Sequence, residues 1–237
     1  MSGNTIDLES GFDDASKRYD VMVGLNPGYR KHLRLAAEEV VKGVTDPVPT
    51  LLDLGCGSGL STRELLRAAR KRGLTPRIIG VDASAGMLEH ARAKSWPEGV
   101  EFVHGRGEDL GSLGLPPAHG ALAAYLLRNV PDIDATLTGI RASLVPGATF
   151  VAEEYSVQDD PRAARRWKIV NTGIILPLAR VVTGEVELYR YLHASVDDFM
   201  GIGQVAAHFE AAGFTDVAAR TVEGWQNGIL HLVRGTA

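Results

Sequence analysis

Three glycines at alternate positions are the first residues of this sequence whose spacing could do chemistry. Gly55, Gly57 and Gly59 directly follow the apolar run 51–54 and precede a pattern typical of a helix. Because glycine has no side chain, the backbone can turn sharply there and a ligand can approach it closely. A glycine-rich turn between a strand and a helix is typical of a loop that binds a nucleotide-like ligand. The sequence therefore predicts a small-molecule cofactor at this turn.

The spacing of the glycines argues against a dinucleotide. A dinucleotide-binding loop reads G-x-G-x-x-G, but Leu60 stands where the last of those glycines would be. The sequence also has no obvious Tyr-x-x-x-Lys pair, so a nicotinamide oxidoreductase is disfavoured. Asp53, two positions before the first glycine, can accept hydrogen bonds from loop amides or from an amine of a ligand.

A second carboxylate, Asp82, ends the next apolar run, 77–82. A carboxylate at the end of a second strand can accept hydrogen bonds from both hydroxyls of a bound ribose. The alternative is that Asp82 caps the helix that follows it. Ser84 is the more natural cap, which leaves Asp82 for the ligand.

Side chains that could take part in a proton transfer follow two later strands. Glu153 and Tyr155 lie at the carboxyl end of a predicted strand, where a buried glutamate would have a raised pKa suited to a base. The alternative is that both make ordinary hydrogen bonds at the end of a strand. Asn129 could bond an oxygen of the acceptor substrate, and Arg128 could pair with a substrate anion or brace its own loop.

Four other polar residues are weaker candidates. His119 precedes a predicted strand, where we expect a solvated turn, and a lone histidine such as His193 is more often at a surface than in a catalytic site. Asp132 and Asp134 stand at a predicted helix start, where capping explains them. No further ligand completes an octahedral set around these two carboxylates, so we predict no metal.

Short apolar runs alternate with helical patterns from residue 50 onward, which is typical of a mostly parallel α/β sheet. The strands are predicted at Thr50–Leu54, Arg77–Asp82, Val100–His104, Ala121–Leu127 and Ala148–Tyr155, with a final antiparallel pair at Phe214–Val222 and Gly228–Val233. The helices are predicted at Tyr29–Val41, Leu60–Arg72, Ala85–Lys94, Ile133–Leu144 and Val196–Ala212.

Two segments fall outside this alternation, and we interpret residues 1–237 as a single domain that carries both. Residues 1–48 form a predicted N-terminal cap segment, and residues 156–197 form a predicted lid-like insertion. Open α/β sheets bind ligands at the carboxyl ends of their strands, so additional segments placed there can shape a pocket and exclude water.

Composition limits the partners. A net charge of −4 and a pI near 6.0 give no reason to expect a nucleic acid. With one cysteine, Cys56, no internal disulfide can form, and neither a secretory signal nor an apolar stretch long enough to span a bilayer is found. We expect a cytoplasmic protein without stable membrane insertion that acts on a small molecule. A homodimer is compatible with the sequence, which carries no signal for oligomeric state.

Residues 52–59 (LDLGCGSG) and 81–88 (VDASAGML) resemble class I S-adenosylmethionine-dependent methyltransferases. Within that superfamily the chain resembles the ubiquinone/menaquinone-biosynthesis C-methyltransferases. That resemblance rests on four short motifs in the same order: YD at 19–20, LRNV at 127–130, YRYLHASV at 189–196 and GILHLVRG at 228–235. It implies a Rossmann-like, seven-stranded, mostly parallel sheet with helices on both faces and an antiparallel last strand.

The resemblance also implies roles for individual residues. Gly55, Gly57 and Gly59 would cradle the methionine part of S-adenosylmethionine, Asp82 would hold the ribose, and Met87 would lie near the adenine. Further cofactor contacts are implied for Tyr19, Asp53, Cys56, Ala83, Gly107, Glu108 and Leu126.

The sequence departs from the family pattern at two places. The family has Gly-Asp after the third strand, where the acid binds the adenine amino group, but this chain has Gly105-Arg106. Arginine cannot accept a hydrogen bond, so the Gly107 backbone or Glu108 would take that role. The family's His-Arg pair in the N-terminal segment is shifted here to Arg30-Lys31.

The resemblance implies methyl transfer from S-adenosylmethionine to carbon or oxygen of a small aromatic, phenolic or quinone-like acceptor. Such a displacement depends mainly on alignment, which can contribute about 7–11 kcal/mol, so few catalytic residues are needed; Glu153, Tyr155 and Asn129 are the candidates. The alternative is a methyltransferase-like protein that binds the cofactor without transferring methyl, as a cyclase or a ligand-binding protein.

Overall fold

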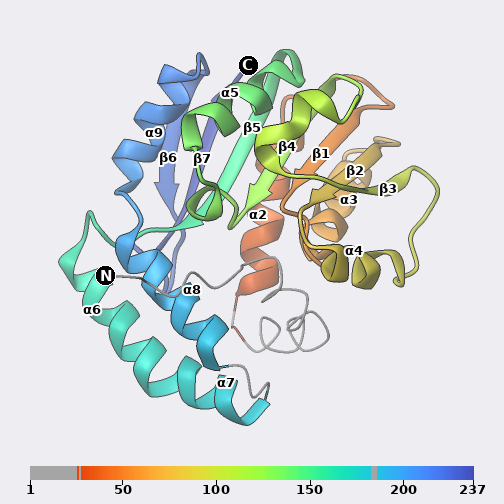
Figure 1. The fold of residues 1–237 in the computed structure, drawn as a ribbon. Helices are drawn as coiled ribbons and strands as arrows, with labels where there is room; N and C mark the ends of the chain where they lie inside the picture. The colour runs from red at the N-terminus through yellow and green to blue at the C-terminus, as the bar shows by residue number, and fades with distance from the viewer. Residues whose placement is uncertain (1–25, 27, 183–185) are drawn as a thin grey trace.

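The computed structural model describes residues 26, 28–182 and 186–237, and these residues form one sheet with helices on both faces (Figure 1). Seven described strands lie in the order β3-β2-β1-β4-β5-β7-β6. Their bounds are β1 Thr50–Leu54, β2 Arg77–Asp82, β3 Val100–His104, β4 Ala118–Ala124, β5 Leu144–Tyr155, β6 Thr215–Thr221 and β7 Leu230–Thr236.

Of these seven strands, β7 runs in the direction opposite to the other six. It pairs antiparallel with both β5 and β6, whereas the pairs among β1 to β5 are parallel. The predicted Rossmann-like sheet is therefore confirmed.

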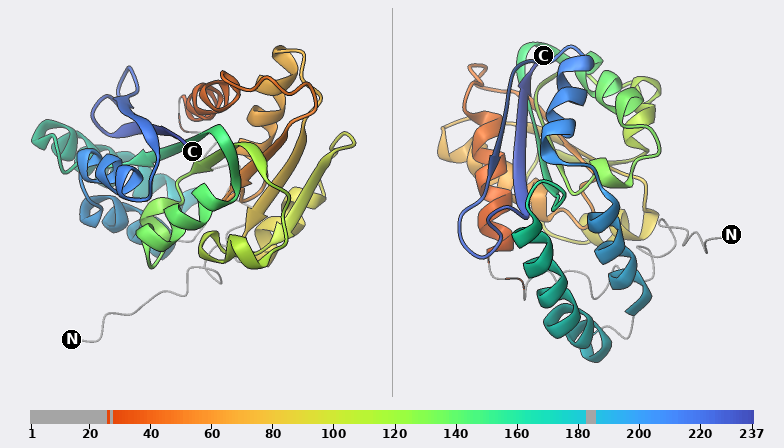
Figure 2. Two further views of the ribbon diagram at one scale, coloured as in Figure 1. Left: turned by 90° about the horizontal axis from the view of Figure 1, so that it is seen from above. Right: turned by 90° about the vertical axis from the view of Figure 1, so that its left-hand side faces the viewer.

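Helices cover both faces of the sheet (Figure 2). Their bounds are α2 Tyr29–Val41, α3 Leu60–Lys71, α4 Ala85–Arg92, α5 Ile133–Ala142, α6 Pro161–Val170, α7 Leu176–Val182, α8 Val186–Asp198 and α9 Ile202–Ala211. Two short 3-10 helices, η1 Gly107–Ser112 and η2 Leu127–Asn129, and one π-helical turn, η3 Asn171–Ile175, complete the described elements.

The central strands are buried on both sides, which explains their nearly continuous apolar sequences. One face of the sheet packs against α2 and α3 through a cluster that includes Ala36, Val40, Leu51, Leu65, Leu122 and Val151. The other face packs against α5 and α9 through a cluster that includes Leu52, Ala121, Leu137, Phe150, Val205 and Phe209. Successive residues of each strand thus contact opposite helical layers, and the carboxyl ends of the strands are held at one edge.

The single helix predicted at Val196–Ala212 is wrong. The structure has two helices there, α8 and α9, because the chain turns between them at residues 199–201. The Asp159 carboxylate accepts a hydrogen bond from Ile202 N at 2.7 Å and starts the second helix. Asp159 is far away in the sequence, so a local helical pattern could not show this break.

The boundaries around β4 and β5 also differ from the predictions. β4 spans Ala118–Ala124 instead of Ala121–Leu127, because Tyr125 adopts a φ of 61° and turns the chain into η2. β5 begins at Leu144 instead of Ala148, so Pro146-Gly147 lies within the strand and not after a helix. A register shift in the pairing of β4 with β5 accommodates these residues.

The two additional segments take different positions. In the N-terminal segment, α2 packs on the sheet face beside α3. The helices α6, α7 and α8 of the 156–197 segment instead lie below the sheet in Figure 1, at the end where the parallel strands finish. No helix among the described residues is long and apolar enough to cross a membrane.

Removing the Asp159 carboxylate should loosen α9. We expect Asp159→Ala to lower the free energy of unfolding by about 1 kcal/mol, the usual effect of losing a helix-start hydrogen bond, as measured by urea denaturation. Asp198→Ala removes an exposed carboxylate at the end of α8 and serves as the control, with a change within about 0.5 kcal/mol. Equal stability of the two variants would contradict this account of the break.

Candidate functional site

A cavity of about 580 Å³ lies at the carboxyl ends of β1, β2 and β4. A cavity of this size is typical of a site for a cofactor or small substrate. Its lining comes from the glycine-rich loop, the ends of β1, β2 and β4 and the loops that follow β2, β3 and β4, with single residues or first turns of α2, α3, α4 and α8. The lining residues are Tyr29, Leu54, Gly55, Cys56, Gly57, Ser58, Leu60, Ser61, Val81, Asp82, Ala83, Ser84, Met87, Gly105, Arg106, Gly107, Glu108, Ala124, Tyr125, Leu126, Arg128, Asn129, Val130, Pro131 and Leu192.

The glycine-rich loop forms one wall of the cavity, and its glycines have different roles. All three adopt positive φ, at 66° for Gly55, 51° for Gly57 and 85° for Gly59. A Cβ on Gly59 would lie 2.8 Å from Trp96, so packing disfavours any side chain there, whereas one on Gly55 would lie 3.2 Å from Leu126 and would require only a small shift of that leucine. A Cβ on Gly57 would meet nothing within 4 Å. Gly57 is therefore the glycine that leaves open space for a ligand, whereas Gly59 does not line the cavity.

Asp82 lines the cavity and also organises its wall. Its carboxylate accepts hydrogen bonds from Gly57 N at 2.7 Å and from Ser84 N at 2.9 Å. Ser84 caps α4 as expected, since its hydroxyl accepts from Met87 N at 3.0 Å. The expectation that Asp82 is left entirely for a ligand is wrong, because it also ties two loops together. A carboxylate has about four acceptor positions, so two loop amides do not by themselves prevent it from accepting a ribose hydroxyl.

Asp53 lies behind the loop and not in the cavity. It is fully buried, and its Oδ2 accepts hydrogen bonds from the hydroxyls of Ser61 at 2.8 Å and Thr62 at 2.5 Å. Burial raises its pKa to about 7, although these two hydrogen bonds oppose the rise. Asp53 thus joins β1 to the first turn of α3, and the residues it binds were not predicted from sequence.

The side of the cavity expected to bind adenine is formed by residues near α4 and η1. Met87 is buried and lines the cavity, as do Ala83, Gly107 and Glu108. The exposed Arg106 also lines it, at the position where an acid was expected from the family pattern. Cys56 and Leu126 line the cavity as well, whereas Tyr19 lies outside the described residues.

Tyr125, which the sequence analysis missed, directly follows β4 and lines the cavity. Its hydroxyl donates to Glu153 Oε1 at 2.7 Å, and its backbone N donates to Glu153 O at 2.8 Å. Burial raises the pKa of Tyr125 well above its usual value. An aromatic residue directly after the fourth strand was the available signal, but only the positive φ at 125 turns this side chain toward Glu153.

Glu153 itself is fully buried and does not line the cavity. Burial raises its pKa to about 8, with a further increase from the neighbouring Glu154 and an opposing contribution from the Tyr125 hydrogen bond. Among the described residues, Oε2 of Glu153 has no hydrogen-bond partner. Glu153 is thus linked to the cavity wall by its hydrogen bond with Tyr125.

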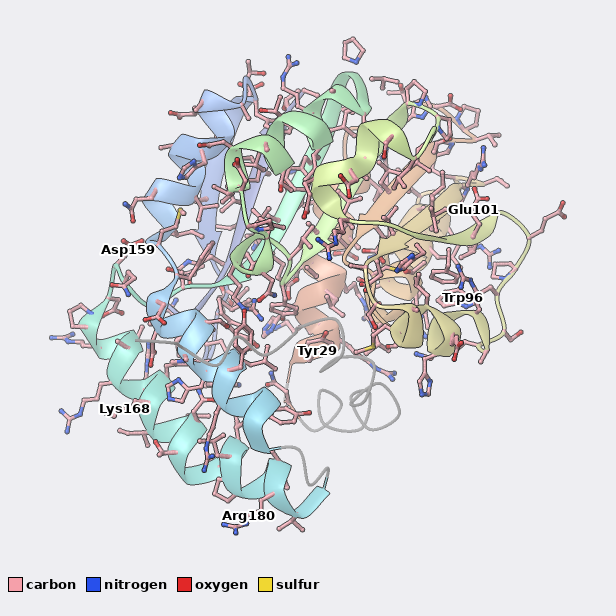
Figure 3. The ribbon with its side chains drawn as sticks, in the orientation of Figure 1. Tyr29, Trp96, Glu101, Asp159, Lys168 and Arg180 are labelled. Carbon is pink, nitrogen blue, oxygen red and sulfur yellow. The ribbon has the colours of Figure 1, made fainter. Side chains whose placement is uncertain are left out.

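Five aromatic rings contact one another in a continuous row, the aromatic stack, in which the first two pairs are stacked and the last pair is edge-on. Ring centroids lie 5.7 Å apart for Tyr29 and Tyr125, 5.0 Å for Tyr125 and Tyr155, 5.2 Å for Tyr155 and Trp167, and 5.8 Å for Trp167 and His193. Tyr29, which Figure 3 labels, lies at the end of α2 nearest the carboxyl edge. The stack joins α2, β5, α6 and α8 to the loop after β4.

Tyr155 occupies the middle of this stack and not the cavity wall. Its hydroxyl accepts from Gln226 Nε2 at 2.8 Å and from Asn26 Nδ2 at 3.3 Å. Burial raises its pKa to about 12, so Tyr155 stays a neutral phenol and is a poor base. The structure places it away from the position expected of a catalytic group.

Arg128 and Glu154 form a buried ion pair next to the cavity. Arg128 Nη1 lies 2.7 Å from Glu154 Oε2, and their side chains are 6% and 0% exposed. Burial raises the pKa of Glu154, while the charge of Arg128 opposes the rise. Arg128 Nε also donates to Ser195 Oγ at 3.3 Å, so Arg128 braces the loop against α8.

Asn129 lines the cavity, as expected, but its side chain is already engaged. Its Nδ2 donates to Tyr125 O at 2.9 Å, and its Oδ1 accepts from the Tyr191 hydroxyl at 3.5 Å. The contact with Tyr191 is long, so Oδ1 is the atom that could exchange its partner for a ligand.

The remaining polar candidates lie outside the cavity lining. Asp132 caps α5 by accepting from Ala135 N at 2.9 Å, and Asp134 lies 2.5 Å from His208. His119 is in β4, where its Nδ1 accepts from Thr50 N, so the solvated turn expected there is wrong. His193 is 16% exposed and lies 3.3 Å from Asp197. No group of three or more potential metal ligands occurs in the described part of the chain.

Comparison with known proteins places this geometry in a family. Residues 3–235 match the model of the ubiE/COQ5 methyltransferase family. The chain belongs to the ubiE/COQ5 methyltransferase family. It is 30% identical over 232 residues to a ubiquinone/menaquinone biosynthesis C-methyltransferase of Bradyrhizobium sp. (strain BTAi1 / ATCC BAA-1182), covering 94% of this chain and 88% of that protein. A protein of the same name from Methylobacterium nodulans is 31% identical, covering 90% and 84%.

Solved structures share the fold at lower identity. A SAM-dependent methyltransferase from Aquifex aeolicus superposes with a TM-score of 0.58 at 17% identity, covering 94% of this chain and 97% of that one. Phosphoethanolamine N-methyltransferase 2 of Haemonchus contortus, solved with S-adenosyl-L-methionine, gives a TM-score of 0.64 at 14% identity, covering 100% and 61%. This member of the ubiE/COQ5 family is an S-adenosylmethionine-dependent methyltransferase.

The residues of the cavity fit that cofactor. The open face of Gly57 leaves room for a ligand at the backbone, and the Asp82 carboxylate lies beside it in the same wall. When bound, S-adenosylmethionine supplies an electrophilic methyl group on a sulfonium. We expect Gly57 and Asp82 to hold its methionine and ribose parts, with Met87 beside the adenine.

A methyl group placed at Gly57 should block cofactor binding. We expect Gly57→Ala to weaken binding of S-adenosylmethionine by at least about tenfold (1.4 kcal/mol) in calorimetry, because its Cβ would occupy the open space. Gly73→Ala is the matched control, since Gly73 also has a positive φ, 78°, with nothing within 4 Å of its Cβ, but lies at the end of α3. Equal loss of affinity in both variants would show that backbone strain alone is responsible.

The raised pKa of Glu153 should make folding depend on pH. The pKa of Glu153 is about 8 in the folded protein, against a usual value of 4.5, so the folded protein binds this proton more tightly than the unfolded chain does. Protonation of Glu153 therefore adds to the free energy of unfolding at low pH, and this addition is lost as the pH rises through about 8. We expect Glu153→Gln to flatten the fall in the free energy of unfolding between about pH 5 and 8. The exposed control Glu210→Gln should keep the wild-type slope, and a wild-type slope in both variants would contradict the raised pKa.

Proposed function

We propose that this enzyme transfers the methyl group to a ring carbon of a hydroxylated aromatic acceptor of the hydroquinone type. The observation that carries the proposal is Tyr125, a residue of the cavity wall whose hydroxyl donates a hydrogen bond of 2.7 Å to the buried Glu153. Methylation on carbon is supported by the names of the relatives, which are C-methyltransferases of ubiquinone and menaquinone biosynthesis. Methylation on an oxygen of the same acceptor is the alternative.

The acceptor would lie beyond the cofactor, against Tyr125. This part of the cavity combines apolar walls with a few polar groups, a lining suited to an aromatic ring that carries oxygens. Asn129 Oδ1 can accept a hydrogen bond from an acceptor hydroxyl in place of its long contact with Tyr191. The apolar members of the wall are Leu126, Val130, Pro131 and Leu192.

The Tyr125–Glu153 pair would remove a proton from the acceptor. The acceptor hydroxyl gives its proton to Tyr125 Oη while Tyr125 gives its own proton to Glu153 Oε1. The electron pair left on the acceptor oxygen would make the neighbouring ring carbon nucleophilic. This carbon would take the methyl group that the cofactor supplies as the methyl–sulfur bond breaks, with the electron pair of that bond staying on sulfur. The methylated carbon would then lose its proton to water, which restores the aromatic ring, and the proton held on Glu153 would return through Tyr125 to the acceptor oxygen. Tyr155, a neutral phenol outside the cavity, has a packing role in this scheme.

A second function, cofactor binding without methyl transfer, is favoured by one observation. The cationic Arg106 lines the cavity where the family pattern has an acid. Incubation with methyl-labelled S-adenosylmethionine and a panel of hydroquinones and phenols tests the two functions. Label that enters an acceptor supports methyl transfer, and label that never leaves the cofactor supports the second function. Spectroscopy of the product then separates methylation on carbon from methylation on oxygen.

The acceptor is a small molecule and not a nucleic acid in this proposal, because the chain has a net charge of −4. A cytoplasmic location and a homodimer stay predictions from the sequence.

Two matched Tyr→Phe variants separate catalysis from packing. We expect Tyr125→Phe and Glu153→Gln each to lower kcat by roughly 10²–10⁴, the usual contribution of a proton-transfer group. Tyr155→Phe removes the neighbouring hydroxyl, which is hydrogen-bonded to Tyr125 but belongs to no residue of the cavity wall, and should leave kcat within about threefold of the wild type. The wild-type rate should rise with pH through about 8, because the base must be ionised, and Glu153→Gln should lose this rise.

Equal effects of Tyr125→Phe and Tyr155→Phe on kcat would contradict the proton-transfer role. An unchanged pH profile in Glu153→Gln would contradict it as well.

A further inference from the structure

A stretch of unusual charge begins shortly after β5. Residues 161–182, which form α6, η3 and α7, contain no Asp or Glu and five basic residues: Arg162, Arg165, Arg166, Lys168 and Arg180. We call this segment the basic arm. The whole chain has a net charge of −4, so the basic arm is strongly positive on an acidic protein. All five basic residues are exposed.

The basic arm also exposes large apolar side chains. Ile169 is 61% exposed, Ile174 is 60% exposed and Val181 is 85% exposed. Among the described residues, Val48 is the one other large apolar residue exposed to this degree. Apolar exposure is therefore concentrated on the same segment as the positive charge.

The inner face of the basic arm explains how it is held in place. Ala163 and Trp167 are buried against Val157, Val196 and Ile229, and Ala179 is buried against Tyr189 of α8. The arm is thus a packed part of the fold, and the cations and aliphatic side chains occupy its outer face. Figure 3 shows Lys168 and Arg180 pointing away from the rest of the molecule.

The spacing places cations and an aliphatic residue on one helical face. Counted from Arg162, three residues follow at three, four and seven positions: Arg165, Arg166 and Ile169. This spacing brings all four to the same side of α6. A helix face that mixes basic and aliphatic residues is typical of a segment that lies on an anionic membrane surface. The aliphatic side chains enter the boundary of the acyl chains while the basic side chains bind the anionic headgroups.

The arm lies at the same end of the molecule as the cavity. In Figure 1, α6, α7 and α8 are at the end of the sheet where the parallel strands finish, and Leu192 of α8 lines the cavity. A surface bound through the arm would therefore be near the edge that carries the site.

We propose that the outer face of the basic arm docks on bilayers that contain anionic lipids, without spanning them. Positive charge and exposed aliphatic side chains together match such a surface, and no described helix is long and apolar enough to cross it. A second copy of this chain fits less well. In a dimer that paired two basic arms, the five cations of one arm would face the five cations of the other. Outside the arm, Val48 is the one large apolar residue that the described surface exposes for an arm to contact.

Vesicle binding of the full chain tests this proposal independently of catalysis. Sedimentation with phosphatidylglycerol/phosphatidylcholine vesicles should show binding that decreases as salt is raised, and phosphatidylcholine vesicles alone should bind at least about tenfold more weakly. Arg162→Gln combined with Arg165→Gln should weaken binding to the anionic vesicles by at least about tenfold. Ile174→Ser combined with Val181→Ser should weaken it by about as much.

The matched controls change the same residue types outside the arm. Arg70→Gln at the end of α3 and Val48→Ser before β1 alter exposed residues at the opposite edge of the sheet and should bind like the wild type. Circular dichroism and cofactor affinity equal to those of the wild type would show that the arm variants are folded. Absence of binding to anionic vesicles at low salt would overturn the proposal. A wild-type dimer in light scattering that Ile174→Ser with Val181→Ser converts to a monomer would also overturn it, in favour of a second copy.

Discussion

Two consecutive buried glutamates at the end of β5 hold the loop on which the acceptor side of the site depends. Glu153 binds the Tyr125 hydroxyl, and its backbone oxygen binds the Tyr125 amide. Glu154 accepts from Leu127 N at 2.6 Å and pairs with Arg128. Burying two carboxyl groups side by side is costly unless each is neutral or paired. Glu153 is kept mostly neutral by its raised pKa, and Glu154 is paired with Arg128, so both can stay buried while they hold the loop after β4.

The two sides of the site are built by different physical means. The cofactor side relies on backbone geometry: glycines with positive φ, and a carboxylate, Asp82, that fixes two loop amides. Such a wall is nearly independent of side-chain motion. The acceptor side relies on long-range side-chain contacts, because Glu153 and Tyr125 are brought together by the pairing of β5 with β4.

Local sequence patterns were sufficient for the part of the fold that is made locally. The bounds of β1, β2 and β3 agree with their predictions, since each is a short apolar run bounded by turn residues. The cofactor wall could be predicted for the same reason, because the glycine-rich loop and Asp82 follow these strands directly.

Long-range contacts decided what the sequence could not show. The break between α8 and α9 depends on Asp159, and the end of β4 depends on the left-handed conformation of Tyr125. Glu153 was placed at the correct edge of the sheet, but nothing near it in the sequence shows that it is hydrogen-bonded to Tyr125. Asp53 and Tyr155 were also placed at strand ends correctly, yet both point into the protein, toward α3 and toward the aromatic stack.

The ionisation properties of the site suit a relay better than a direct base. Burial raises the pKa of Tyr125 well above its usual value, so this phenol does not hold a negative charge itself. Glu153, with a pKa of about 8, is ionised in roughly a tenth of molecules at pH 7. A carboxylate with a raised pKa is a stronger base than an ordinary one and lies closer to the pKa of about 10 of a phenol. The same burial that makes the carboxylate scarce at neutral pH therefore makes it a stronger base when it is present, and its hydrogen-bond partner Tyr125 belongs to the cavity wall.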